Sequence, residues 1–252
     1  MLTVSAAGNC GDKPYCVSSP SSAKGAISVA QTTPPSAVAP LISVYDTMFE
    51  GAFFPWTTQP ESAISGLLQY GSGNNLSGCE SFPDGPLDGK IVLVDRGDCL
   101  FSDKVMNIEK AGGKAAIVIN NVPGQPFPGD FSGGVAPTIP GYMISQDDGA
   151  ILKSLLSIDV TAYIDPTLLK SLKGYTMRSS ARGPDMSYNG IKPEIAAPGG
   201  MLAAVVGTGT GELNFGGTSS ASPVVAGAAA ILKQWCKDCT PLAIKVRMHA
   251  MR

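Results

Sequence analysis

The chain has 252 residues, of which 44% are hydrophobic and 15% are charged, so it can form one large or two ordinary globular domains and is not expected to be disordered. Its net charge of -2 and the lack of any run of Lys or Arg argue against nucleic acid or an anionic membrane as the main partner. No apolar stretch reaches the roughly 18 residues that a membrane span needs, and the first residues lack the basic start and apolar centre of a secretion signal.

The first segment of the chain is predicted to form two short strands. Residues 2–7 are a β-rich run that ends in a turn at Gly8 and Asn9. Asparagine tolerates the left-handed backbone that such a turn needs, so a purely structural role is open for Asn9. Residues 25–30 are apolar and predict a buried strand, and the paired prolines Pro34 and Pro35 then mark a boundary.

The middle of the chain has a βαβ-like pattern. Residues 88–99 predict a turn and a strand, residues 102–112 a helix with apolar side chains at a spacing of three to four, and residues 115–120 a second buried strand. Asp95, Arg96 and Asp98 form a charged cluster that could be catalytic. Charges that flank a turn are usually solvated, so a solvated surface position is the alternative for this cluster.

A serine lies before an apolar helix near the end of the chain. Gly216 and Gly217 allow a sharp turn, Pro223 is expected in the first turn of the helix, and residues 224–232 are apolar on all sides, which predicts a buried helix. The hydroxyl of Ser219 would then lie at the positive end of that helix, which suits a nucleophile whose attack generates an oxyanion. The alternative is that Ser219 or Thr218 is simply the N-cap.

This serine segment resembles the nucleophile motif of the subtilisin-like serine proteases (subtilases), because residues 217–223 read Gly-Thr-Ser-Ser-Ala-Ser-Pro. The resemblance implies that Ser219 is the nucleophile and that Gly217 and Thr218 form the turn presenting it. Residues 6–9, Ala-Ala-Gly-Asn, resemble the segment that carries the oxyanion-hole asparagine, which implies that Asn9 donates its amide N–H to the oxyanion. The same resemblance implies that the substrate pocket is lined by Ala6, Ala7 and Gly8.

The middle unit resembles a protease-associated (PA) domain, since residues 89–99 follow that family's Gly-Lys-Ile-x-Leu-Val-x-Arg-Gly-x-Cys signature. The resemblance implies an internal Cys79–Cys99 pair and a unit that contacts substrate or another protease chain. We therefore expect a partial subtilase catalytic domain at 1–34, a PA insert at 35–165 and the serine segment of the catalytic domain at 166–252. The expected fold class is α/β: a partial subtilisin-like parallel sheet with helices on both faces, interrupted by an α+β or β-rich PA domain.

The six cysteines form three near pairs: Cys10 and Cys16, Cys79 and Cys99, Cys236 and Cys239. An even count in a loop-rich chain suggests an oxidising compartment, so we expect a secreted protein or one of the secretory or vacuolar route. Cys10 and Cys16 bracket a loop and could be bridged. The third pair could instead be a redox or metal half-site, although no second CxxC or histidine pair completes four zinc ligands.

A hydroxyl nucleophile needs a base, and the family supplies a His backed by an Asp, both before the oxyanion asparagine. Here the only histidine is His249, after the serine helix, where a surface position is expected. The sequence therefore resembles only the C-terminal part of a catalytic domain, and we expect a serine endopeptidase fragment that is inactive alone and acts on protein or peptide, with no cofactor and no metal. The alternatives are a non-catalytic PA-type binding module and a redox protein that uses Cys236 and Cys239.

Overall fold

The computed structural model describes residues 1–71, 73–83, 87–131 and 133–250. The chain divides into two compact units, one made of Met1–Ala37 and Leu172–Arg252 and the other of Val38–Ser171. The second unit contains residues 89–99, the segment that follows the PA domain signature. The first unit is therefore discontinuous in sequence, with one short segment before the second unit and one long segment after it.

The first unit is built on a three-stranded parallel sheet in the order β1-β2-β10, whose strands are Thr3–Ala6, Ala26–Thr32 and Ile195–Pro198. The central strand β2 is buried over its first six residues. Ile27 and Val29 pack into an apolar cluster, while Ser28 between them hydrogen bonds to the hydroxyl of Ser21. Successive side chains of a strand point to opposite faces, so burial of successive residues means that both faces of β2 are covered. The α/β fold class is confirmed.

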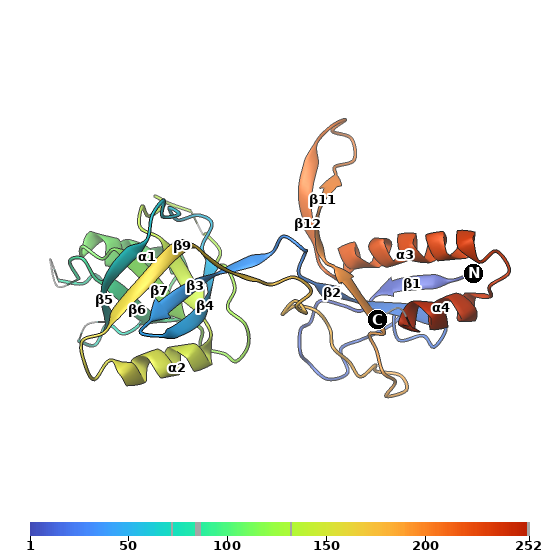
Figure 1. Cartoon of the computed structure of the whole chain (residues 1–252), viewed down its shortest axis with the longest axis horizontal. Coiled ribbons are helices and arrows are strands. Elements are labelled where there is room, and N and C mark those ends of the chain that lie inside the picture. The colour runs from blue at the N-terminus through green and yellow to red at the C-terminus, as the bar shows by residue number, and fades with distance from the viewer. Residues whose placement is uncertain (72, 84–86, 132, 251–252) are drawn as a thin grey trace. The chain divides into compact units, whose positions relative to one another are not determined.

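Helices α3 (Thr218–Trp235) and α4 (Pro241–Ala250) share that apolar cluster with the sheet (Figure 1). Helix α3 buries Ala221, Val225 and Ala229, which lie one turn apart on one stripe. Leu232 is partly buried against the same cluster, whereas Val224, Ile231 and Trp235 are exposed, so the helix is buried on one stripe and not on all sides as predicted. Pro223 also lies inside the helix, past its first turn, because the helix begins earlier than expected.

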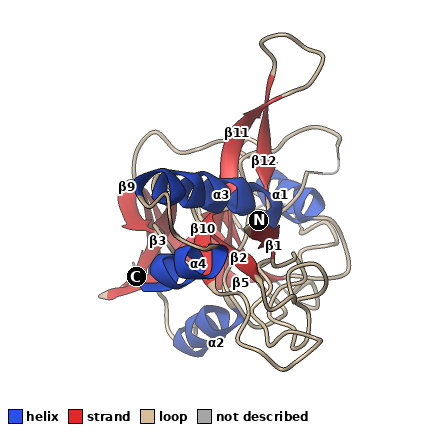
Figure 2. Ribbon diagram, turned by 90° about the vertical axis from the view of Figure 1, so that its right-hand side faces the viewer, coloured by secondary structure: helices blue, strands red, loops and turns tan. Residues whose placement is uncertain are grey.

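A hairpin leads into α3. Its strands β11 (Gly200–Ala204) and β12 (Glu212–Gly216) pair in antiparallel fashion, and they extend away from the three-stranded sheet (Figures 1 and 2). The segment before it, residues 195–200, forms β10 and the first residue of β11. The last hairpin residue, Gly216, pairs with Gly200, so the hairpin brings the chain directly to the turn before Ser219.

The second unit is a closed barrel in the order β3-β4-β8-β7-β6-β5-β9. Its strands are Val38–Val44 (β3), Thr47–Phe53 (β4), Ile64–Tyr70 (β5), Ile91–Asp95 (β6), Ala115–Ile119 (β7), Gly141–Ile144 (β8) and Thr161–Ser171 (β9). Helices α1 (Phe101–Lys110) and α2 (Gln146–Leu155) complete the unit. The predicted βαβ-like arrangement is confirmed, because β6 and β7 are parallel neighbours joined through α1.

The parallel strands of the barrel are covered on both faces. Val92 and Val118 pack with Ile108 of α1, whereas Leu93 packs in a second cluster with Leu152 of α2. This explains the uninterrupted apolar runs of β6 and β7, since a strand covered on both faces needs no polar alternation.

Strand β9 runs further than the sequence suggested. The expected PA insert, 35–165, ends inside this strand. In the structure the pairing of β9 with β3 is interrupted after Ile164 and resumes at Leu169, so Pro166 falls where no ladder hydrogen bond is required. The Asp165 carboxylate accepts a hydrogen bond from the Thr167 N–H at 2.8 Å within this irregular stretch. The compact unit ends at Ser171.

All three cysteine pairs are bridged in the structure: Cys10 with Cys16, Cys79 with Cys99, and Cys236 with Cys239. The Cys79–Cys99 bridge lies beside the buried side chain of Lys104, whose ammonium donates to the carbonyl oxygens of Ser77 at 2.6 Å and Gly97 at 2.7 Å. Burial lowers the pKa of Lys104 from its usual value. The bridge and the lysine together join the loop that follows β5 to the loop that follows β6.

Candidate catalytic site

Ser219 lies in the first turn of α3 with an exposed side chain, between the fully buried Thr218 and Ser220. The N-cap residue of the helix is Gly217, and no side chain caps the first turn. The interpretation of Ser219 or Thr218 as a simple N-cap is therefore wrong. The structure instead presents the Ser219 side chain at the positive end of a long helix, as the sequence analysis expected.

Asn9 lies directly against the turn before Ser219. Its side-chain oxygen accepts the Thr218 N–H at 2.9 Å and the Thr218 hydroxyl at 3.1 Å, although the two residues are 209 positions apart. The Thr218 hydroxyl oxygen in turn accepts the Gly8 N–H at 3.1 Å. Because two donors occupy the oxygen of the Asn9 amide, its nitrogen is left as the group that can donate to a ligand.

Gly217 permits the close approach of these two segments. Its φ is 111°, a backbone conformation that favours glycine, and a Cβ at this position would lie 2.9 Å from the Asn9 amide nitrogen. The nitrogen therefore lies over the turn that precedes Ser219. A side chain at position 217 would displace either the turn or Asn9.

Further hydrogen bonds tie this turn to the end of β10. The Gly199 carbonyl accepts both the Gly217 N–H at 2.8 Å and the Ser220 hydroxyl at 2.7 Å. The Ser222 hydroxyl donates to the Thr218 carbonyl at 2.8 Å. Three of the four hydroxyls of the motif, those of Thr218, Ser220 and Ser222, are thus engaged internally. Within the described part of the chain, no hydrogen bond engages the hydroxyl of Ser219.

Ala6, Ala7 and Gly8, the residues expected to line a substrate pocket, form the end of β1 and the turn after it. Ala7 is buried against Val17 and Ala181, while Ala6 and Gly8 are half-buried. The Gly8 carbonyl accepts the Ala181 N–H at 2.9 Å. A pocket at this position stays a prediction.

His249 is in α4 and lines a cavity of about 460 Å³ together with Pro193, Glu194 and Met248. The cavity lies at the start of β10, whereas Gly199, which bonds to the serine turn, follows the end of that strand. No imidazole or carboxylate is hydrogen-bonded to Ser219 in the ranges that the structure describes. The histidine therefore provides no base to Ser219 in this arrangement.

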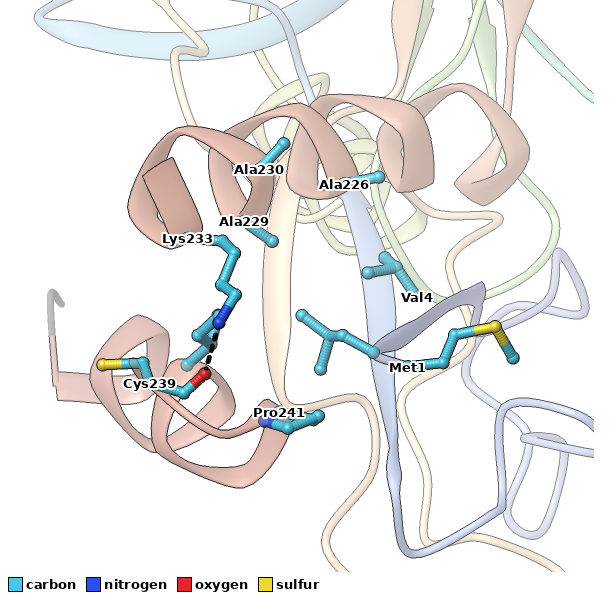
Figure 3. Close-up of a pocket in the computed structure, with 10 residues that line it drawn as sticks. Met1, Val4, Ala226, Ala229, Ala230, Lys233, Cys239 and Pro241 are labelled. Atoms are coloured by element: carbon cyan, nitrogen blue, oxygen red, sulfur yellow. Dashed lines mark hydrogen bonds between the residues drawn. The ribbon is translucent and has the colours of Figure 1, made fainter. Parts of the chain in front are cut away.

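A larger cavity, of about 470 Å³, lies along the middle and end of α3 (Figure 3). Met1 and Val4 line one side of it, and Ala226, Ala229 and Lys233 of α3 line another. Lys233 donates across it to the Cys239 carbonyl at 2.9 Å. The cavity is mostly apolar and begins two turns beyond Ser219, so it does not belong to the serine site.

The described residues hold no group of three or more His, Cys, Asp or Glu side chains placed to bind a metal ion. None of their helices is both long and apolar enough to cross a membrane.

A buried ion cluster was missed by the sequence analysis. One Glu194 carboxylate oxygen accepts from Lys192 at 2.9 Å and from Lys245 of α4 at 2.6 Å, and the other oxygen accepts the Ser28 N–H of β2 at 2.8 Å. Both ammonium groups also donate to the Ala26 carbonyl, each at 2.8 Å. Charged residues are rarely buried, so nothing in the sequence pattern distinguished these from surface side chains.

Replacing Thr218 by valine tests the link between the two segments. Valine keeps the shape of threonine but cannot accept from the Gly8 N–H or donate to Asn9, so we expect the free energy of unfolding to fall by about 1–3 kcal/mol. Urea denaturation followed by circular dichroism measures the change. The matched control is Thr208→Val, whose hydroxyl bonds to the Val205 carbonyl in the exposed hairpin loop and whose loss is expected to cost under about 0.5 kcal/mol. Equal costs for the two variants would contradict the linkage described here.

The amino-acid sequence matches the PA domain family over residues 64–152. It is 31% identical to the minor extracellular protease Vpr of Bacillus subtilis (strain 168) over 249 residues, covering 93% of this chain and 29% of Vpr. It is 29% identical over 245 residues to a C5a peptidase of Streptococcus pyogenes serotype M3, covering 93% of this chain and 20% of that protein. Identity to the subtilisin-like protease SBT3 of Solanum lycopersicum is 33% over 184 residues, covering 66% of this chain and 23% of SBT3.

The chain thus spans less than a third of the length of each of these relatives. The similarity to Vpr extends over nearly all of the chain and so includes both compact units, the one with the serine turn and the one with the PA match. The serine motif, the PA match and the named relatives agree. The chain belongs to the subtilisin-like serine proteases that carry a PA domain.

Proposed function

We propose that this chain carries the nucleophile and one oxyanion donor of a serine endopeptidase that hydrolyses peptide bonds through an acyl-enzyme. Ser219 Oγ attacks the carbonyl carbon of the substrate, and the carbonyl oxygen becomes an oxyanion. The Asn9 amide nitrogen donates to that oxyanion, and Gly217 and Thr218 shape the turn that presents the serine. Ala6, Ala7 and Gly8 line the side of the cleft that receives the residue before the scissile bond.

The observation that carries this proposal is the contact between Asn9 and Thr218, at 2.9 Å across 209 positions. An asparagine whose oxygen is occupied, placed against the turn before an exposed serine, supplies a fixed N–H donor beside a hydroxyl. Such a preorganised donor stabilises the transition state because it needs no reorientation when charge develops. A serine whose only role was to start the helix would not require such an N–H donor.

The proposed mechanism also needs a base that removes the Ser219 proton, and the described residues place none beside it. We therefore propose two things: the Ser219 oxygen forms adducts with electrophilic inhibitors, and the chain does not turn over peptides. A peptide with a C-terminal boronic acid tests the first half, because a serine oxygen that adds to boron forms a tetrahedral adduct resembling the intermediate.

Adduct formation is expected in the unmodified chain at pH 8–9, followed by the ¹¹B NMR shift, and is expected to be lost in Ser219→Ala. Ser222→Ala is the matched control and should keep the adduct, since its hydroxyl is bound to the Thr218 carbonyl. Removal of an oxyanion donor in Asn9→Ala should weaken the adduct by about tenfold or more. An adduct that survives in Ser219→Ala would refute the assignment of the nucleophile.

A fluorophosphonate probe tests the second half, because its reaction requires an activated serine. We expect the unmodified chain to be labelled no faster than Ser219→Ala. Fast labelling that disappears in Ser219→Ala would contradict the proposed inactivity and would show that a base reaches the serine.

Protein or peptide substrates and a secreted location complete the proposal. Support comes from the relatives, one of which is named an extracellular protease, and from the three bridged cysteine pairs, which suit an oxidising compartment. The PA unit is proposed to contact substrate or another protease chain. The named relatives are proteases, and they do not favour the alternative of a non-catalytic binding module.

A further inference from the structure

Strand β5 of the second unit changes partner halfway along its length. Its first four residues, 64–67, pair with β9, and its last three, 68–70, pair with β6 on the other side. The last hydrogen bond toward the β9 side joins the Leu68 N–H to the Val160 carbonyl at 2.7 Å. Beyond that point the chain before β9 leaves β5, and no described residue pairs with the free side of Tyr70.

The backbone groups on that free side belong to alternate residues. The Gly71 N–H donates to the Leu93 carbonyl of β6 at 2.9 Å, so Gly71, and Gln69 two residues earlier, direct their backbone groups toward β6. Tyr70, between them, directs its N–H and C=O away from β6. The end of β5 is therefore a short open strand edge within an otherwise closed barrel.

A cavity of about 350 Å³ follows this edge. Its lining includes four consecutive residues of β5, residues 67–70, and also Leu156, Ile158 and Asp159, which lie between α2 and β9 in the chain. Consecutive side chains of a strand point to opposite faces of the sheet, so a cavity on one face would be lined by alternate residues only. The cavity therefore runs along the strand edge, where an added strand would lie.

Two lysines reach this cavity from opposite faces of the sheet. The Lys90 ammonium donates to the side chain of Gln69, and the Lys153 ammonium lies 4.3 Å from the centre of the Tyr70 ring. Gln69 and Tyr70 are neighbours in the strand and point to opposite faces, so the two lysines do as well. Lys153 is also paired with Asp95 at 2.7 Å, and its side chain is 34% exposed.

We propose that this edge binds an extended acidic peptide as an additional strand on β5. The peptide backbone would pair with the N–H and C=O of Tyr70, and two successive acidic side chains of the peptide would point to the two faces, one toward Lys90 and the next toward Lys153. Leu67, Leu156 and Ile158 would contact the aliphatic parts of the bound segment. Asp159 contributes a negative charge to the same cavity, which disfavours uniformly anionic ligands and favours a peptide with carboxylates at these two positions.

The proposed peptide site is independent of the chemistry at Ser219, because it lies wholly within the second unit. The partner proposed for the second unit is an acidic extended segment of a protein. A negative result in the peptide-binding test would leave the boronate and fluorophosphonate results unaffected.

The test uses the whole chain and a fluorescein-labelled peptide, Val-Thr-Glu-Glu-Val-Thr, with fluorescence anisotropy as the readout. A peptide with Gln-Gln in place of Glu-Glu tests the charges, and a peptide N-methylated at alternate amides tests the strand pairing. We expect the dissociation constant to rise about two- to fivefold in each of Lys90→Gln and Lys153→Gln. Lys110→Gln, an exposed lysine at the end of α1, is the matched control and should bind normally.

The N-methylated peptide is expected to bind at least about tenfold more weakly, since it cannot form the strand hydrogen bonds. Hydrogen exchange of the Tyr70 amide, followed by NMR, should slow when the unmodified peptide is added. Absence of binding by the unmodified peptide, equal binding of the N-methylated peptide, or unchanged affinity in both lysine variants would each overturn the proposal. Melting temperatures of the variants show that any loss of binding is not a loss of folding.

Discussion

Replacing Glu194 by alanine is expected to lower the free energy of unfolding by about 3–5 kcal/mol, because it leaves two buried ammonium groups without a carboxylate. The side chains of Lys192, Glu194 and Lys245 are only 6%, 11% and 10% exposed, so water cannot compensate for the lost partner. Chemical denaturation in urea measures the change. We expect it to be among the largest effects of any single substitution in the first unit.

The matched control is Asp12→Ala, which removes the exposed ion pair with Arg182 at 3.4 Å. An exposed pair of this kind contributes at most about 1 kcal/mol, so the control should unfold nearly as the unmodified chain does. If Glu194→Ala cost no more than Asp12→Ala, the burial of the cluster would be contradicted.

The same cluster predicts a dependence of stability on pH. Burial alone would raise the pKa of the Glu194 carboxyl, but hydrogen bonds from Lys245, the Ser28 N–H and Lys192 outweigh it and hold the pKa below its usual 4.5. A carboxyl whose pKa is depressed by folding stabilises the protein above its unfolded pKa, and this contribution is lost as the pH falls through the folded value. Glu194→Gln should therefore show a shallower loss of stability below pH 4.5 than the unmodified chain.

Gly183→Ala is expected to destabilise the first unit by about 2–5 kcal/mol. The φ of Gly183 is 84°, and a Cβ there would lie 1.8 Å from the backbone carbonyl oxygen of Lys192, which cannot move aside as a flexible side chain could. The backbone of two loops would have to shift. Thermal and urea unfolding both report the effect.

The same substitution at Gly227 should have the opposite sign. Gly227 lies inside α3, and a Cβ there would meet nothing within 4 Å. Alanine is a better helix former than glycine, so Gly227→Ala should raise the free energy of unfolding by about 0.5–1 kcal/mol. Finding that both alanines destabilise to the same degree would mean that the local geometry at Gly183 is not the cause.

The regular helix and strands of the second unit could be predicted from the spacing of their apolar residues. The helix around Val105 and the apolar strands of the βαβ-like unit follow from spacing alone, since they are regular and covered on both faces. The hairpin β11 and β12 was not predicted. Leu213 and Phe215 alternate with polar residues, but β12 is only five residues long and all of them are exposed, so no core contact accompanies the pattern. The expected end of the insert, residue 165, falls inside β9, which accommodates Pro166 at a position without a partner on β3.

The candidate site was predictable to the extent that a short motif carries it. The structure brings Asn9 against the turn before the exposed Ser219, on segments that no local pattern would bring together, while the catalytic roles of both residues stay predictions. The part played by Thr218, which donates to Asn9 and accepts from Gly8, could not be anticipated because it depends on a three-dimensional contact. The Glu194 cluster was missed because its burial depends on Lys245, which lies 51 positions after Glu194 and reaches it only in the folded chain.

The junction between the two units has a consequence for the order of folding. The second unit begins at Val38 and ends at Ser171, which are paired strand residues, and just outside it the Leu172 N–H donates to the Ala37 carbonyl at 2.9 Å. Once the barrel has formed, the chain ends that leave it are already neighbours. The loop that must close before Asn9 meets Thr218 is then shortened by the whole insert, and each halving of a loop recovers about 0.6 kcal/mol of closure entropy. A formed second unit therefore lowers the entropic cost of bringing Asn9 to Thr218 by about 1 kcal/mol.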